Sequence, residues 1–347
     1  MVDRILKILL LLSPLVYFMG IDLNIVDLIF FRLGVIVLFC ASLFDKPKRN
    51  INIALPISLI MGLCLFNLFT HAFNQVVFSY TLNIFLALMA LSIIVNYASP
   101  LDKFRKWIIG AVAINIIVFI AQKFGFSPII QNPQGEPGGI LGNAPRFIDY
   151  LTLTLAVVCS YSLWFIIPLL IISLIVKEYT LLGIAVIYLF LKIKNKVFRI
   201  SLVGTSFIGM ILLHKQIIFS LVNVRWLVWK PTIEAIFQNP LGYGLGLFPQ
   251  LSSQFIKTNG YQVEFVSNSY LEFIFGAGLL ELALIFWGVN KFIKRFDLSI
   301  EALSVLSILL LSCLEYPLEI PKLWFTIIAL TGFYIIKQKG ANDVSPQ

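Results

Sequence analysis

The sequence predicts an all-α, polytopic integral membrane protein, as indicated by its composition, its recurrent apolar stretches and the placement of its cations. Of its 347 residues, 59% are hydrophobic and 12% are charged, whereas soluble domains are about half apolar and a quarter charged. One crossing takes roughly 20 apolar residues, and such stretches follow one another almost to the end of the sequence. We therefore expect a single membrane domain over residues 1–347, with about twelve helical spans.

Each predicted span ends where apolar residues give way to charges, Gly or Pro. The spans lie near residues 5–20, 25–44, 51–69, 76–96, 107–124, 147–161, 163–176, 179–192, 199–214, 269–289, 299–314 and 321–336. Residues 147–176 could instead form one tilted helix. A hairpin broken near Ser160-Tyr161-Ser162 is favoured, because one helix would put the cations of residues 192–199 on the outer face.

The cations form short clusters between apolar stretches, and this placement encodes membrane topology. It excludes a nucleic-acid-binding module and a nucleic-acid partner, although the formal net charge is +9. With the N-terminus in the cytoplasm, the cytoplasmic clusters are Arg4 and Lys7; Lys46, Lys48 and Arg49; Lys103, Arg105 and Lys106; Lys192, Lys194, Lys196 and Arg199; Lys291, Lys294 and Arg295; and Lys337 and Lys339. Both termini are then expected in the cytoplasm.

Two outer segments are longer than a tight connection, and function concentrates in long loops. Residues 125–146 are rich in Pro and Gly, and residues 215–268 form the longest predicted loop. Within the second, residues 231–238 are predicted to form a short helix with Pro in its first turn. Because Trp226 and Trp229 add to its apolar side, we expect this helix to lie at the membrane surface.

The long outer loop contains three motifs in order: Arg-x-x-x-Trp, Pro-Leu-Gly-x-Gly-x-Gly-x-Phe and Asn-x-Tyr-Leu-Glu. Their residues are Arg225 and Trp229; Gly242, Gly244 and Gly246; and Asn268 and Tyr270. Upstream, residues 139–145 match Gly-x-x-Gly-Asn-x-x. In order, sidedness and span number, this set resembles the bacterial O-antigen ligase and O-antigen polymerase superfamily over roughly residues 110–290.

The resemblance implies a C-type membrane glycosyltransferase of the bacterial inner membrane that acts at the outer face. Such enzymes take glycan from an undecaprenyl-pyrophosphate-linked oligosaccharide and pass it to a glycan or lipid acceptor, in lipopolysaccharide and other surface-polysaccharide biosynthesis. The resemblance implies no metal ion and no other cofactor. Other polysaccharide-assembly proteins could be further partners.

The functional positions of the family fall on Lys177, Arg225 and Ser267. The family has arginine at the first two and histidine at the third, so only Arg225 is retained. A lysine at 177 keeps the charge but loses the planar fork of arginine. A serine hydroxyl is too weak a base to replace histidine near pH 7. Glu264, three residues before Ser267, and Glu178, beside Lys177, are candidate bases by position.

A role for the cations also follows from physical chemistry, independently of the family resemblance. A departing pyrophosphate gains negative charge, and fixed cations aimed at it lower the barrier. Arg225, Lys177 and Arg146 are the candidates, with Arg225 preferred for its bidentate geometry. Each has an alternative: Arg225 could be an interfacial anchor beside Trp226, and the other two could be solvated charges at helix ends.

The three motif glycines are predicted to form a tight loop that brings the backbone close to the lipid head. They do not have the spacing of a dinucleotide-binding loop.

Three functions are compatible with these sequence features. The missing histidine slightly favours a polymerase over a ligase. An exporter or flippase would place ionisable residues along a central path, whereas the predicted spans 51–69, 76–96 and 163–176 contain no Asp, Glu, Lys, Arg or His. An inactive relative that serves as a scaffold would explain the exchanges at Lys177 and Ser267.

Overall fold

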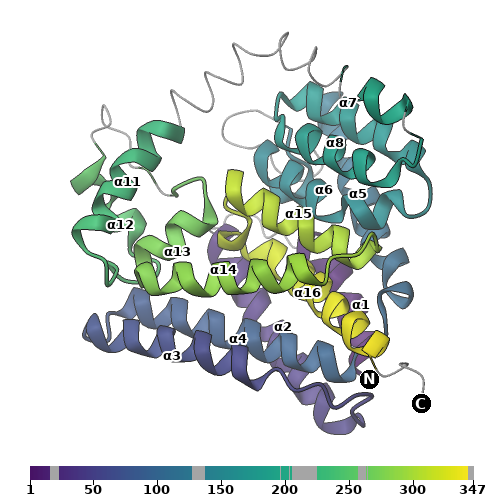
Figure 1. Cartoon of the computed structure of the whole chain (residues 1–347). Coiled ribbons are helices and arrows are strands. Elements are labelled where there is room, and N and C mark those ends of the chain that lie inside the picture. Colours follow the sequence, from purple (N-terminus) through teal and green to yellow (C-terminus); the bar gives the residue numbers. More distant parts are fainter. Residues whose placement is uncertain are drawn as a thin grey trace.

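The computed structural model describes residues 1–15, 23–126, 137–195, 197–202, 204, 225–256, 263 and 265–342. Over these residues the chain is all-helical, as predicted (Figure 1). Within the described residues, three helical segments are long and apolar enough to cross a membrane: Ile25–Phe44, Gln75–Tyr97 and Arg105–Lys123. Shorter apolar helices accompany them.

The helices named below have the following bounds: α1 Val2–Leu12, α2 Leu23–Phe44, α3 Ala54–Thr70, α4 Gln75–Tyr97, α5 Arg105–Lys123, α6 Ala144–Cys159, α7 Ile166–Val176, α8 Thr180–Lys192, α11 Trp226–Gln238, α12 Phe248–Phe255, α13 Ser269–Ala277, α14 Leu279–Lys294, α15 Ile300–Leu314 and α16 Pro321–Asn342. Most predicted spans coincide with one of them. The predicted break at residues 160–162 is confirmed, because α6 ends at Cys159 and α7 begins at Ile166. The predicted span 199–214 lies largely outside the described residues.

The prediction of one continuous helix over residues 269–289 is wrong, because the chain breaks at Gly278 between α13 and α14. Gly278 has φ +87°, a left-handed conformation that side chains disfavour. Its N–H closes α13 on the Ile274 carbonyl (2.8 Å), and the next N–H, of Leu279, donates to the Pro240 carbonyl (2.9 Å). A Cβ at Gly278 would lie 2.5 Å from that carbonyl oxygen. The glycine therefore lets the backbone at Pro240 dock at the break.

The predicted long loop over residues 215–268 is more helical than expected in the part that the structure describes. The expected helix over residues 231–238 begins earlier, at Trp226, so Pro231 lies inside α11. Proline removes a helical hydrogen bond at that point, but the first turn gains a tertiary one, since the Trp229 indole N–H donates to the Val266 carbonyl (2.9 Å). The helix α12 was not predicted.

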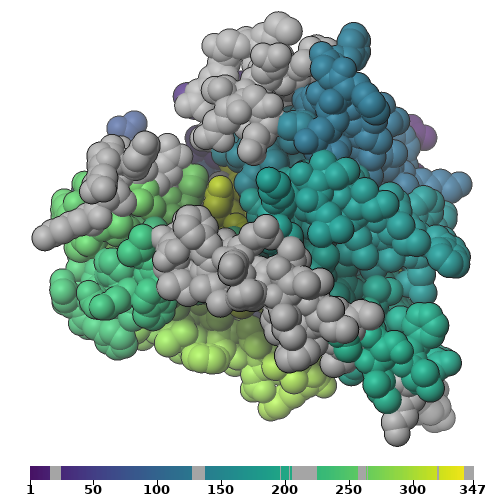
Figure 2. Space-filling view, turned by 90° about the horizontal axis from the view of Figure 1, so that it is seen from above, coloured from purple at the N-terminus to yellow at the C-terminus, as the bar shows by residue number. Residues whose placement is uncertain are grey.

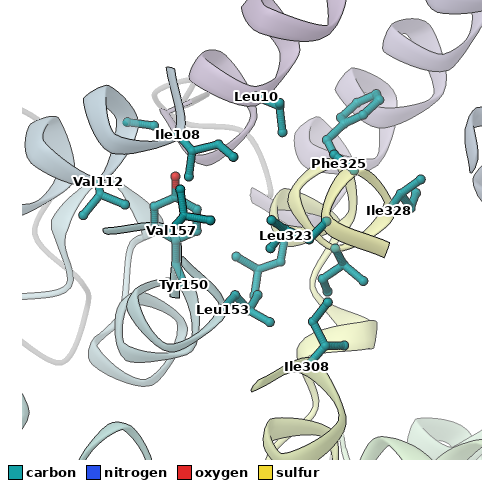
Figure 3. Close-up of a cluster of buried hydrophobic side chains, with 14 of the residues drawn as sticks. Leu10, Ile108, Val112, Tyr150, Leu153, Val157, Ile308, Leu323, Phe325 and Ile328 are labelled. Atoms are coloured by element: carbon teal, nitrogen blue, oxygen red, sulfur yellow. The ribbon is translucent and has the colours of Figure 1, made fainter. Parts of the chain in front are cut away.

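The core is built around α6, whose residues 147–159 are all buried. Figure 3 shows side chains of this core: Tyr150, Leu153 and Val157 of α6; Leu10 of α1; Ile108 and Val112 of α5; Ile308 of α15; and Leu323, Phe325 and Ile328 of α16. Because other helices surround α6, polar residues on it face the protein interior.

One end of the helix bundle gathers charges from segments distant in sequence. The N-terminal amino group pairs with Asp45 (N to Oδ2, 2.6 Å), and Lys48 Nζ pairs with Asp3 (2.8 Å). Here α1 begins and α16 ends (Figure 1). We call this the basic end; it comprises residues 1–3, 45–49, 98–105, 192, 297–301 and 334–338.

Candidate functional site

Away from the basic end, Arg225 and Glu315 form an ion pair. Arg225 directly precedes α11, and Glu315 directly follows α15. Their side chains are 14% and 8% exposed. The hydroxyl of Thr180, the first residue of α8, donates to Glu315 Oε1 (3.2 Å), and the backbone N–H of Ser269 donates to the Glu315 carbonyl (3.1 Å). Glu315 thus joins α8, α11, α13 and α15.

Further charged side chains surround this pair. Asp149, on the central helix α6, is only 2% exposed, and its charged neighbours are Glu315, Glu178, Arg225 and Arg146. We call these five residues the charge cluster. Viewed from above, Figure 2 shows atoms of the C-terminal segment, in yellow, at the bottom of a hollow between the green α11–α13 side and the teal α6–α8 side. The cluster residues come from the elements that border this hollow.

The carboxyl group of Glu315 lies between the predicted spans 299–314 and 321–336. Burial raises its pKa to about 7, although Arg225 and the hydrogen bond from Thr180 act in the opposite direction. The nearby Glu178 carboxylate adds to the rise. A carboxyl group with this pKa can gain and lose a proton near neutral pH, as a general base must.

A second buried ion pair lies between α2 and α16. Lys322 Nζ is 3.6 Å from Asp27 Oδ1, and each side chain is 1% exposed. Lys322 also donates to the Ile140 carbonyl (3.5 Å) in the upstream Gly-x-x-Gly-Asn motif, and Arg146 is among its charged neighbours. Buried charges therefore extend from the charge cluster into the bundle.

The Asn-x-Tyr motif fixes the position of α13. Asn268 caps that helix, with its Oδ1 accepting from the Leu271 N–H (3.0 Å), and its Nδ2 donates to the Cys313 carbonyl (2.8 Å). Tyr270 donates from its hydroxyl to the Leu309 carbonyl (3.2 Å). Both bonds hold α13 against α15, next to Glu315.

The glycine motif packs against protein backbone. A Cβ at Gly242 would lie 2.3 Å from the Gly276 carbonyl oxygen, and the Gly244 N–H donates to the same oxygen (3.0 Å). Gly246 lies against the ring of Tyr80. The predicted tight loop is confirmed. Its backbone closely approaches the α13–α14 break, whereas the prediction was a close approach to a lipid head. These glycines have a structural role here.

The structure brings Arg225 and Arg146 together in the charge cluster and leaves Lys177 apart. Lys177 is exposed at the C-terminal end of α7, with φ +62°, and the neighbouring Glu178 faces the cluster instead. Ser267 is half-buried, with φ +55°. Glu264 lies outside the described residues, so its role as a base stays a prediction.

Sequence reasoning missed Glu315, Asp149 and the Lys322–Asp27 pair. Three of these residues could have been selected as ionisable side chains within a predicted span, because such a side chain is by default a candidate functional residue. Asp27, Asp149 and Lys322 all fall inside such spans. Glu315 lies one residue beyond one, where a charge is commonplace.

No protein-family model and no curated protein sequence matches this chain. The function is therefore inferred from the motifs and from the geometry of the charge cluster.

Proposed function

We propose that this chain is a membrane glycosyltransferase of the O-antigen polymerase or ligase type. It would transfer glycan from an undecaprenyl-pyrophosphate-linked donor at the outer face of the bacterial inner membrane. The observation that carries the proposal is Arg225, the one family position retained, which is largely buried and held by Glu315. Its Nη2 points to Glu315, and its other N–H groups make no hydrogen bond with the described residues. These donors suit pyrophosphate oxygens.

The proposed reaction keeps the charge of the site balanced. The acceptor hydroxyl gives its proton to Glu315 while its oxygen bonds to the donor sugar carbon. The bond from that carbon to the pyrophosphate oxygen breaks, and undecaprenyl pyrophosphate leaves with the electron pair. As Glu315 becomes neutral, Arg225 turns its charge to the leaving group, where it lowers the barrier.

The reaction needs the charge cluster to face the side of the membrane where the donor lies. We propose twelve spans with both termini in the cytoplasm. Support comes from α8 and α15, each of which has one end at the charge cluster, near Thr180 or Glu315, and the other at the basic end, near Lys192 or Ile300. Seven of the predicted cytoplasmic cations lie at the basic end: Lys46, Lys48, Arg49, Lys103, Arg105, Lys192 and Lys337. This supports an outer-face position for the cluster.

Cysteine labelling should reveal this topology. After replacement of Cys40, Cys64, Cys159 and Cys313, a membrane-impermeant thiol reagent should modify Asn259→Cys in intact spheroplasts and spare Asn195→Cys. Asn195 follows α8 beyond the basic end, whereas Asn259 belongs to the long outer loop. Labelling of both variants in opened membranes is the control. The reverse pattern would put the charge cluster in the cytoplasm.

The glycan-transfer proposal itself is tested with purified protein in nanodiscs, a lipid-linked oligosaccharide donor and several acceptors. Chain extension or transfer, measured by mass spectrometry of the products, is the expected result. Absence of transfer by the wild-type protein with every donor and acceptor would reject the proposal and favour the inactive scaffold.

An exporter or flippase is the second candidate, because one structural observation favours it. The Lys322–Asp27 pair and Arg146 continue the buried charges of the cluster into the bundle, as a transport path would. Such a protein would move a lipid-linked glycan across proteoliposomes without changing its covalent structure. Transfer without translocation would favour the glycosyltransferase.

A further inference from the structure

The basic end contains a cavity of about 520 Å³. It is bordered by residues before α3, at the start of α5, at the end of α8, at the start of α15 and near the end of α16. Four cations line it: Arg49, Arg105, Lys192 and Lys337. The lining carboxylates are Asp102 and Glu301, so positive charge is in excess.

The four cations are neutralised unequally. Arg105 pairs with Asp102, and Lys337 lies 3.5 Å from Glu301 Oε2. In contrast, Arg49 donates to the Ala98 carbonyl (2.7 Å) and Lys192 to the Leu298 carbonyl (2.9 Å). Among the described residues neither Arg49 nor Lys192 has a carboxylate within ion-pair distance. A backbone carbonyl orients a cation but contributes no full negative charge.

The remaining lining favours a ligand with an apolar part. Pro100, Ile300, Phe333 and Ile336 contribute hydrophobic surface to the same cavity. The cavity also lies where the apolar helix α4 ends and the apolar helix α5 begins, at the level expected for lipid headgroups. A free anion would use the cations alone, whereas a lipid would use both surfaces.

We propose that this cavity binds the phosphate of an anionic phospholipid headgroup, with Arg49 and Lys192 as its main ligands. The phosphodiester oxygens would accept from both cations, and the glycerol and upper acyl carbons would lie on the apolar lining. Basic pockets between helices on the cytoplasmic side of membrane proteins bind such headgroups. The site is separate from the charge cluster and does not depend on glycan transfer.

The charge of Arg49 is compensated only in part by a carboxylate. Partial burial lowers the pKa of its guanidinium, and the nearby Asp3 carboxylate opposes this only in part. A phosphate beside Arg49 would complete the compensation of its charge.

Lipid binding is measured on the detergent-purified full chain by native mass spectrometry, with phosphatidylglycerol, phosphatidylcholine and inorganic phosphate as probes. The wild type should retain phosphatidylglycerol in preference to phosphatidylcholine. R49Q/K192Q should bind phosphatidylglycerol about 25-fold more weakly, because each cation contributes about five-fold. The matched control K103Q/K106Q removes two exposed cations of the same end that do not line the cavity, and it should bind normally.

Two further measurements keep the result interpretable. R49K/K192R retains both charges and should retain most of the affinity, and thermal unfolding of each variant shows whether the fold survives. Equal affinity of R49Q/K192Q and the wild type, or no preference over phosphatidylcholine, would overturn the proposal. Competition by inorganic phosphate at concentrations similar to the lipid would also overturn it, since the cavity would then be a free-anion site.

Discussion

Arg225→Ala should reduce glycan transfer by about 10³-fold. A unit charge pair separated by about 4 Å in an effective dielectric near 20 contributes about 4 kcal/mol. This energy corresponds to about three powers of ten in rate. Arg225→Lys should keep a small fraction of the activity, because the charge remains but the planar fork is lost. The measurement is the single-turnover rate in nanodiscs with saturating donor.

The control variant is Lys230→Ala, which removes a cation from the same helix. Lys230 is 62% exposed and lies 4.0 Å from Glu234 on the surface of α11, so its loss should leave the rate unchanged. Removing Arg225 leaves Glu315 buried without its partner, which can cost about 3–5 kcal/mol of stability. R225A/E315Q removes both charges and separates misfolding from lost chemistry: it should fold and remain inactive. Normal transfer by Arg225→Ala would make Arg225 an interfacial anchor.

Local sequence features predicted the helices well where one rule decided the outcome. Apolar length and flanking charge located most of the helices, and the placement of the cations at residues 192–199 favoured a break near Ser160-Tyr161-Ser162. Gly278 shows the limit of this reasoning. A single Gly within an apolar stretch is compatible with a continuous helix, and only the docking of the loop at Pro240 makes it a break.

The candidate site was predicted only in part, since motifs identify residues but not their partners. Arg225 could be selected from its motif, whereas Glu315 lies 90 positions away and no motif includes it. The ion pair requires α8, α11 and α15 to meet, which is a property of the packed bundle. Lys177 illustrates the converse: its position matched the family pattern, but its side chain is exposed and its neighbour Glu178 faces the cluster.

Glu315→Gln should lower glycan transfer by at least about 10²-fold near pH 7.5, the range expected when general-base assistance is lost. Glutamine keeps the size of the side chain and an oxygen that can accept from Thr180 and Arg225, so donor binding should change little while turnover falls. Glu315→Asp keeps the carboxylate with a shorter reach and should retain more activity than Glu315→Gln. Glu234→Gln, which removes an exposed carboxylate of α11, is the matched control.

The pH profile separates a proton acceptor from a group that only positions Arg225. The pKa of Glu315 is raised from 4.5 to about 7, so the basic form accumulates as the pH rises through 7. The wild-type rate should fall about tenfold for each pH unit below that point, and the residual rate of Glu315→Gln should lose this dependence. Glu264 remains the rival base. Three results together would assign the proton to Glu264: an inactive Glu264→Gln variant, partial recovery of its rate on adding Ser267→His, and nearly unchanged transfer by Glu315→Gln. Glu315 would then serve only to hold Arg225.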